Sequence, residues 1–134
     1  MRFYVDTSIW RDYFEDRRDS IRPLGEFAFQ FLNGCKKLGA KLLYSEAVIV
    51  ELQGFSKKWV NEMFLQFRDL LVEAPVLKKQ TDEAKTIAKQ RGLPYNDALH
   101  AIIARDNKAI IVTRDKHFEE LRDIVEAKTP EELL

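Results

Sequence analysis

The feature of this sequence that most constrains its fold is the alternation of short apolar segments with longer segments of helical period. The apolar segments, rich in β-branched and aromatic residues, predict strands over Phe3–Val5, Lys41–Tyr44, Leu70–Glu73 and Ala109–Thr113. The intervening segments predict helices over residues 8–14, 23–37, 46–54, 57–69, 81–91 and 96–107, with a short one near 116–122. Strands that alternate with helices are joined by crossover connections, which build a mostly parallel sheet with helices on both faces. We therefore expect one three-layer α/β domain over residues 1–134.

Several predicted helix ends carry residues that favour such ends. Pro23 suits the first turn of one helix, and Gly39 follows its end. Thr81 is expected to cap the helix that stops at Gly92, and Asn96 to cap the next one. These residues support the helix assignments independently of the apolar pattern.

Composition and charge exclude several classes of protein. The chain has 134 residues, 46% of them hydrophobic, which is enough to bury a core without a disulfide or a structural metal. Its 22 basic and 22 acidic residues cancel, which excludes a polycation and a disordered chain but allows a local basic patch. Cys35 is the single cysteine, no apolar run approaches the ~20 residues of a membrane span, and the amino terminus turns acidic too early for a signal peptide. We expect a soluble cytoplasmic protein.

Two acidic residues follow predicted strands. Asp6 closes the first strand and Asp115 comes just after the last one. In open α/β sheets the carboxyl ends of the strands are where ligands bind, so both are candidate site residues. The alternative for Asp6 is an ordinary cap of the next helix, and for Asp115 a solvated surface acid.

Two further acids lie on predicted helices. Glu51 shares a stripe with Val48 and Leu52, on the apolar side of its helix. An inward carboxylate needs a partner, so the alternative there is a structural ion pair with an arginine. Asp97 opens the helix that carries His100, where an ordinary first-turn aspartate is the alternative.

Together these acids predict a metal site. Close carboxylates repel one another unless a cation neutralises them, and oxygen ligands select a hard ion, so we expect Mg²⁺ or Mn²⁺. Zinc is disfavoured because the chain has no cysteine pair and its two histidines lie in separate segments. We interpret His100 as a partly buried helix residue and His117 as a surface residue.

Four segments resemble the acidic motifs of PIN domains, in particular those of VapC toxins from toxin–antitoxin pairs: Phe3–Ser8, Glu51–Gly54, Leu93–Ala101 and Val112–Phe118. The ending Thr129–Leu133 is also similar to many members. The resemblance implies a parallel sheet of about five strands, a Mg²⁺- or Mn²⁺-dependent endoribonuclease that is usually a homodimer, and inhibition by a VapB-type antitoxin whose tail covers the acidic site.

The resemblance also assigns roles by position. The acidic set becomes Asp6, Glu51, Asp97 and Asp115. Asp6, Asp97 and Asp115 are then expected to hold the metal, and Ser8 and Thr113 to order metal-bound water. One carboxylate, Asp97 or Asp115, would accept the proton of the attacking water, which leaves a 5′-phosphate and a 3′-hydroxyl. Lys116 and His117 stand where members often carry a further acid, so no fifth acid is assigned.

Basic and aromatic residues flank the acidic motifs. The candidate phosphate contacts are Arg11, Arg17, Arg18, Lys57, Lys58, Arg114 and Lys116, each of which is otherwise a plain surface charge. Tyr13 and Trp59 are candidates for stacking on unpaired bases, whereas Trp10 and Phe14 are expected in the core or a dimer contact. Residues 27–32 carry three phenylalanines, more than one buried face needs, and we predict that part of this segment covers a partner chain or an antitoxin helix.

Three other functions compete with this interpretation. A PIN-domain nuclease of RNA processing or decay shares the fold, and a neighbouring antitoxin gene would distinguish the two. A non-catalytic binding module gains nothing from four repelling carboxylates. Aspartyl-phosphate enzymes and phospho-receivers also place an Asp after the first strand, but the phosphatases need a second Asp where this chain has Ser8, and a receiver has no use for Glu51.

Overall fold

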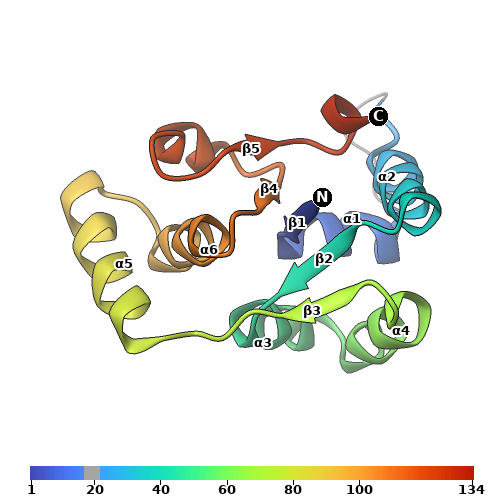
Figure 1. Ribbon diagram of the computed structural model, residues 1–134, viewed down its shortest axis with the longest axis horizontal. Coiled ribbons are helices and arrows are strands. Elements are labelled where there is room, and N and C mark those ends of the chain that lie inside the picture. Colours follow the sequence, from blue (N-terminus) through green and yellow to red (C-terminus); the bar gives the residue numbers. More distant parts are fainter. Residues whose placement is uncertain (17–21) are drawn as a thin grey trace.

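The computed structural model describes residues 1–16 and 22–134. The five strands are β1 (Arg2–Val5), β2 (Lys41–Tyr44), β3 (Leu71–Glu73), β4 (Ile110–Val112) and β5 (Ala127–Lys128). The six α-helices are α1 (Thr7–Glu15), α2 (Leu24–Leu38), α3 (Glu46–Phe55), α4 (Lys57–Phe67), α5 (Lys78–Arg91) and α6 (Tyr95–Asp106). Two short 3-10 helices are η1 (Lys116–Leu121) and η2 (Glu131–Leu133). Strands cross the middle of the molecule, with α5 and α6 on one side and α2 and α4 on the other (Figure 1), which confirms the predicted α/β layers.

The strands form one parallel sheet in the order β3-β2-β1-β4-β5. The chain moves outward from β1 to β2 and β3, then returns through α5 and α6 to place β4 on the other side of β1. The direction of winding therefore reverses between β1 and β4, whose last residues, Val5 and Val112, are paired. This point of reversal, at the carboxyl ends of the two strands, is where open α/β sheets bind ligands.

The starts of two helices differ from the sequence predictions. Helix α5 begins at Lys78 rather than at residue 81, because the side chain of Gln80 reaches back and accepts the backbone N–H of Leu77 at 2.8 Å. The Thr81 hydroxyl donates to the carbonyl of Lys78, so it does not cap the helix. Helix α6 begins at Tyr95, after an extended N-cap residue at Pro94, and not after Asn96.

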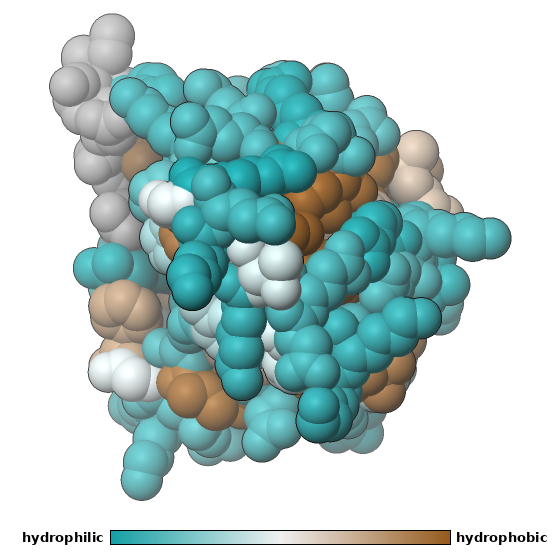
Figure 2. Space-filling model, turned by 90° about the vertical axis from the view of Figure 1, so that its left-hand side faces the viewer, coloured by the Kyte–Doolittle hydropathy of each residue, from teal (hydrophilic) through white to brown (hydrophobic). Residues whose placement is uncertain are grey.

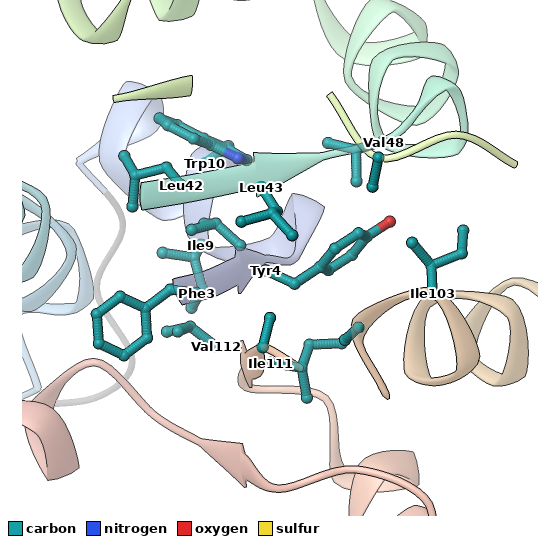
Figure 3. Packing of buried hydrophobic residues seen from close by; sticks show 14 of the residues in the cluster. Phe3, Tyr4, Ile9, Trp10, Leu42, Leu43, Val48, Ile103, Ile111 and Val112 are labelled. Carbon is teal, nitrogen blue, oxygen red and sulfur yellow. The ribbon is translucent and has the colours of Figure 1, made fainter. Parts of the chain in front are cut away.

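The central strands are buried on both faces, as expected for a sheet covered by helices on both sides. Tyr4, Leu43 and Ile111 have no exposed surface, and they pack with Ile103 of α6 and Ile9 of α1 (Figure 3). Side chains from both sides of the sheet therefore hold β1 in place. The short apolar segments of the sequence form the centre of this core.

Helix α6 is the most deeply buried helix among the described residues. Every residue from Ala98 to Ala104 is buried, and the small side chains of Ala101 and Ala104 let it lie close against the sheet. Its outer side is covered by α5, to which Arg105 is joined by two hydrogen bonds to Glu83. Viewed from the side on which α5 lies, the surface is mostly hydrophilic with small recessed hydrophobic areas (Figure 2).

Helix α2 places its aromatic residues on different faces. Phe31 is buried and Phe27 is half-buried, whereas Phe29 is 48% exposed. Part of the aromatic segment of α2 is thus left at the surface of a single chain. Among the residues that the structure describes, no helix combines the length and the apolar character that crossing a membrane requires.

Candidate metal and catalytic site

Asp6 is buried directly after β1 and is held from several directions. Its backbone N–H donates to the carbonyl of Val112, so the end of β1 is fixed to the end of β4. One oxygen of its carboxylate accepts the hydroxyl of Ser8 at 2.8 Å and the hydroxyl of Thr113 at 2.9 Å. Both hydroxyls, which the resemblance expects to order metal-bound water, thus donate to Asp6 in the structure.

The second part of the site is a cluster of Asp97, Asp115 and His117. Asp97 lies in the first turn of α6, and Asp115 lies just before η1. The Nδ1 atom of His117 lies 2.8 Å from Asp97 Oδ2 and 2.9 Å from Asp115 Oδ1. One ligand atom from each of the three residues falls within 4.8 Å of the other two. Segments that are about 20 residues apart in the sequence thus meet at the carboxyl edge of the sheet.

The electrostatic environment of this cluster shifts the pKa of Asp97 most clearly. Burial, followed by the negative charges of Asp115 and Asp6, raises the pKa of Asp97 to about 6, although the hydrogen bond from His117 acts in the opposite direction. Asp115 and Asp6 are therefore close enough for their charges to act on Asp97. Mutual repulsion of this kind is what a bound cation relieves.

Glu51 projects from α3 toward α6, as its apolar stripe predicted, but its partner is a histidine rather than an arginine. Its Oε1 lies 2.5 Å from Nε2 of His100, which is 1% exposed. The charges of Asp6, Glu51 and Asp97 all act on His100. Glu51 therefore borders the aspartates without belonging to the compact cluster around His117.

The donor set fits a divalent cation. The carboxylates of Asp97 and Asp115 are partly buried, close together and accessible, and carboxylate oxygens suit Mg²⁺ and Mn²⁺. His117 adds a nitrogen to a set that the sequence predicted to be purely oxygen. The sequence analysis did not assign His117 to the site, because its position indicates only a surface residue. Its spacing of two residues after Asp115 was the available signal.

Some of the cationic candidates are paired with acidic side chains, and others are exposed to solvent. The guanidinium group of Arg114 makes two hydrogen bonds to Glu131, at 2.7 and 2.8 Å, and one to Asp12 at 3.0 Å, and the side chain is mostly buried. Arg11 pairs with Glu15 and lies over the ring of Phe55.

Three lysines among the candidates are exposed: Lys57, Lys58 and Lys116. The remaining two, Arg17 and Arg18, lie outside the described residues. The exposed lysines are thus the candidates whose charge remains at the surface.

The aromatic candidates pack mainly with one another. Trp10 is fully buried, as predicted, and its ring centre lies 5.4 Å from that of Phe67. The rings of Phe14 and Trp59 stack at 5.8 Å. Tyr13 donates a hydrogen bond to a side chain of α4. Packing against neighbours therefore accounts for the position of each of these rings.

Comparison with known proteins identifies the family. The family model of the PIN domain matches residues 3–124, and the chain belongs to the PIN domain family. No curated protein sequence matches the chain.

Several solved structures have a similar fold. VapC20 from Mycobacterium tuberculosis, a sarcin-ricin loop cleaving toxin, is similar with a TM-score of 0.70 and 15% identity over 96% of this chain and 99% of that chain. VapBC2 from Rickettsia felis, bound to a DNA fragment from its promoter, has a TM-score of 0.68 and 22% identity over 96% of this chain and 98% of that chain. FitAcB from Neisseria gonorrhoeae has a TM-score of 0.65 and 16% identity over 98% of this chain and 99% of that chain. The likeness extends over essentially the whole length of each chain.

Proposed function

We propose that the protein is a Mg²⁺- or Mn²⁺-dependent endoribonuclease. The observation that carries the proposal is the cluster of Asp97, Asp115 and His117, which lies beside the buried Asp6 at the point of reversal in the sheet. Asp97 and Asp115 would hold the ion, with Asp6 as the third metal-binding acid and Glu51 as the fourth acid of the site. Membership of the PIN family supports this assignment.

The chemistry follows from the donor set and from the charges around it. A divalent ion supplies polarisation of a phosphate oxygen and a water of lowered pKa. Asp97 or Asp115 would accept the proton of that water, as the family resemblance implies. Ser8 and Thr113 keep Asp6 in place. In-line attack on phosphorus would leave a 5′-phosphate and a 3′-hydroxyl.

The RNA backbone would be held by surface lysines near the site. Lys116 follows Asp115 directly and is exposed, so its ammonium group can pair with a phosphate beside the scissile bond. Lys57 and Lys58, exposed at the start of α4, offer a second contact region. Arg114 is left out of this set because its donors are taken by Asp12 and Glu131.

We also propose that the nuclease is the toxin of a VapBC-type pair, acts in the cytoplasm, forms a homodimer and is inhibited by a VapB-type antitoxin. The support is the likeness to the toxin VapC20 and to a toxin–antitoxin complex from Klebsiella pneumoniae. The exposed aromatic ring of Phe29 on α2 is consistent with a covered surface. Expression of the wild-type protein should then arrest bacterial growth, and the Asp97→Asn variant should not. Normal growth with active wild-type enzyme would favour a role in RNA processing.

The experiment that tests the activity is cleavage of a mixed pool of structured RNAs by the purified protein. With Mn²⁺ we expect discrete fragments with 5′-phosphate ends, and with EDTA or in the Asp97→Asn variant we expect none. Asp69→Asn is the matched control, because Asp69 is exposed and lies just before β3, at the opposite edge of the sheet. Cleavage that survives EDTA or Asp97→Asn would overturn the proposal.

A further inference from the structure

Four side chains, from β1, α3, α6 and the residue just before α3, form a continuous series of hydrogen bonds beside the candidate site. The Tyr4 hydroxyl lies 2.7 Å from Ser45 Oγ and 2.7 Å from Nδ1 of His100. The other nitrogen of His100, Nε2, contacts Glu51. Tyr4, Ser45 and His100 are buried, and Glu51 is partly exposed at the end of the series. The ring of Tyr4 reaches between Val48 of α3 and α6 (Figure 3).

The chemistry of these groups fixes the direction of one hydrogen bond. An ionised Glu51 can only accept, so Nε2 of His100 must carry a proton and donate it. On the other side of the ring, the Tyr4 hydroxyl can donate to Nδ1 of a neutral imidazole or accept from a protonated one, and Ser45 can adapt to both. Each of the four groups therefore keeps its hydrogen bonds whether His100 is neutral or charged. The bond from His100 to Glu51 persists in both cases.

The location of His100 gives this bond a consequence for the site. His100 lies three residues after Asp97, so both project from the same side of α6. Glu51 belongs to α3, and by itself its flexible side chain would sample several rotamers. Through His100, the carboxylate of Glu51 is held at a set position relative to the carboxylate of Asp97. Tyr4, on the central strand, prevents the imidazole ring from turning.

We propose that His100 is a positioning residue that aims Glu51 at the metal site, and that Tyr4 locks the imidazole ring for this purpose. The inference rests on the proposed nuclease function. Outer partners of ligating and catalytic groups typically contribute about 10- to 100-fold to activity or metal affinity. A comparable loss of kcat is expected when the contact with Glu51 is removed.

Two substitutions of His100 distinguish a role in positioning Glu51 from a role in packing alone. The amide nitrogen of His100→Gln can occupy the place of Nε2 and still donate to Glu51, whereas that of His100→Asn reaches only the place of Nδ1, beside Tyr4. We expect His100→Asn to lower kcat about 10- to 100-fold with KM within about twofold, and His100→Gln to stay within about threefold of wild type. Equal losses in the two variants would overturn the proposal.

A double-mutant cycle tests whether His100 acts through Glu51. In a Glu51→Gln background, His100→Asn should change kcat by less than about twofold, because the group that it positions is already gone. Tyr4→Phe, which removes only a hydroxyl, gives a second cycle if His100→Asn does not fold, and it should lower kcat in the wild-type background alone. Losses that add in both backgrounds would mean a purely structural role and overturn the proposal.

A measurement without activity separates this inference from the nuclease proposal. In ¹⁵N NMR spectra of the wild-type protein, Nε2 of His100 should carry a slowly exchanging proton that Glu51→Gln makes exchange faster. An Nε2 without a proton would overturn the positioning role and leave the nuclease proposal intact. If that proton is present but no RNA is cleaved under any condition, the nuclease function fails, and the catalytic role of His100 falls with it.

Discussion

The hydroxyl group of Thr113 donates a 2.9 Å hydrogen bond to the carboxylate of Asp6, and it joins two residues that are 107 positions apart in the chain. Thr113 comes directly after β4 and Asp6 directly after β1, so this bond closes the carboxyl ends of the two paired strands. The hydroxyl also accepts the backbone N–H of Asp115 at 3.0 Å. One buried side chain thus fixes Asp6 and the start of the segment that carries Asp115 and His117.

Replacement of this hydroxyl should destabilise the fold. Thr113→Val keeps the shape but removes a hydrogen bond to a charged group, which contributes about 1.5–3 kcal/mol to the free energy of unfolding. Urea denaturation measures the loss. Thr86→Val, at an exposed position of α5, is the control and should change the free energy of unfolding by less than about 0.5 kcal/mol. Equal midpoints for Thr113→Val and wild type would contradict the structural role of this bond.

The raised pKa of Asp97 predicts how stability depends on pH without metal. A carboxyl group whose pKa is about 6 in the folded state and about 3.9 in the unfolded state binds more protons when folded. The stability that it contributes is therefore lost as pH rises from about 4 to about 6. Asp97→Asn should remove this dependence and exceed wild type by about 1–2 kcal/mol at pH 7, a figure reduced for solvent screening. Denaturation curves between pH 4 and 7 that run parallel for the two proteins would refute the prediction.

The exposed Lys116 should contribute to RNA binding mainly through its charge. Lys116→Gln is expected to weaken binding of a short single-stranded RNA and to reduce the slope of log K against log salt by about 0.7, the value for one phosphate contact on a single strand. Binding by the cleavage-silent Asp97→Asn protein is the suitable background. Lys37→Gln, on the exposed end of α2, is the control and should leave the slope unchanged. An unchanged slope in the Lys116 variant would remove this residue from the RNA interface.

The exposed Phe29 predicts where a second chain attaches. Its ring is 48% exposed and stacks on Tyr13 at 6.4 Å, which leaves an aromatic surface on α2 next to α1. If this surface covers a second copy, Phe29→Gln should shift the protein from dimer to monomer in sedimentation equilibrium. Leu65→Gln, exposed on α4, is the control. A dimer that persists in the Phe29 variant would place the interface elsewhere.

The sequence could predict the positions of the acids but not how their side chains pair. Asp6 and Asp115 follow apolar strands, and that pattern is visible because buried parallel strands are continuous apolar runs. The contact between His117 and Asp97 depends on how η1 folds back over the start of α6, which no local periodicity encodes. The hydroxyl of Ser45 follows the same logic. A serine just before a helix usually caps it, but the hydroxyl of Ser45 is hydrogen-bonded to the buried Tyr4 of a distant strand instead.

Strand β5 shows a second limit of sequence interpretation. It has only two residues, Ala127 and Lys128, which is too short for an alternating or apolar pattern to be recognised. Its pairing with β4 depends on backbone hydrogen bonds, among them that from Thr113 to Lys128. The five-stranded sheet was therefore implied by the family resemblance rather than by the residues of this strand.

The central claim is that Asp97 and Asp115 bind a divalent cation, and titration of the purified protein with Mn²⁺ tests it most directly. Calorimetry should show saturable binding to wild type and to the Asp69→Asn control. For Asp97→Asn we expect an affinity at least about tenfold lower, because a carboxylate that holds the ion is lost. Equal binding by wild type and Asp97→Asn, or no binding by either, would contradict the account of this site.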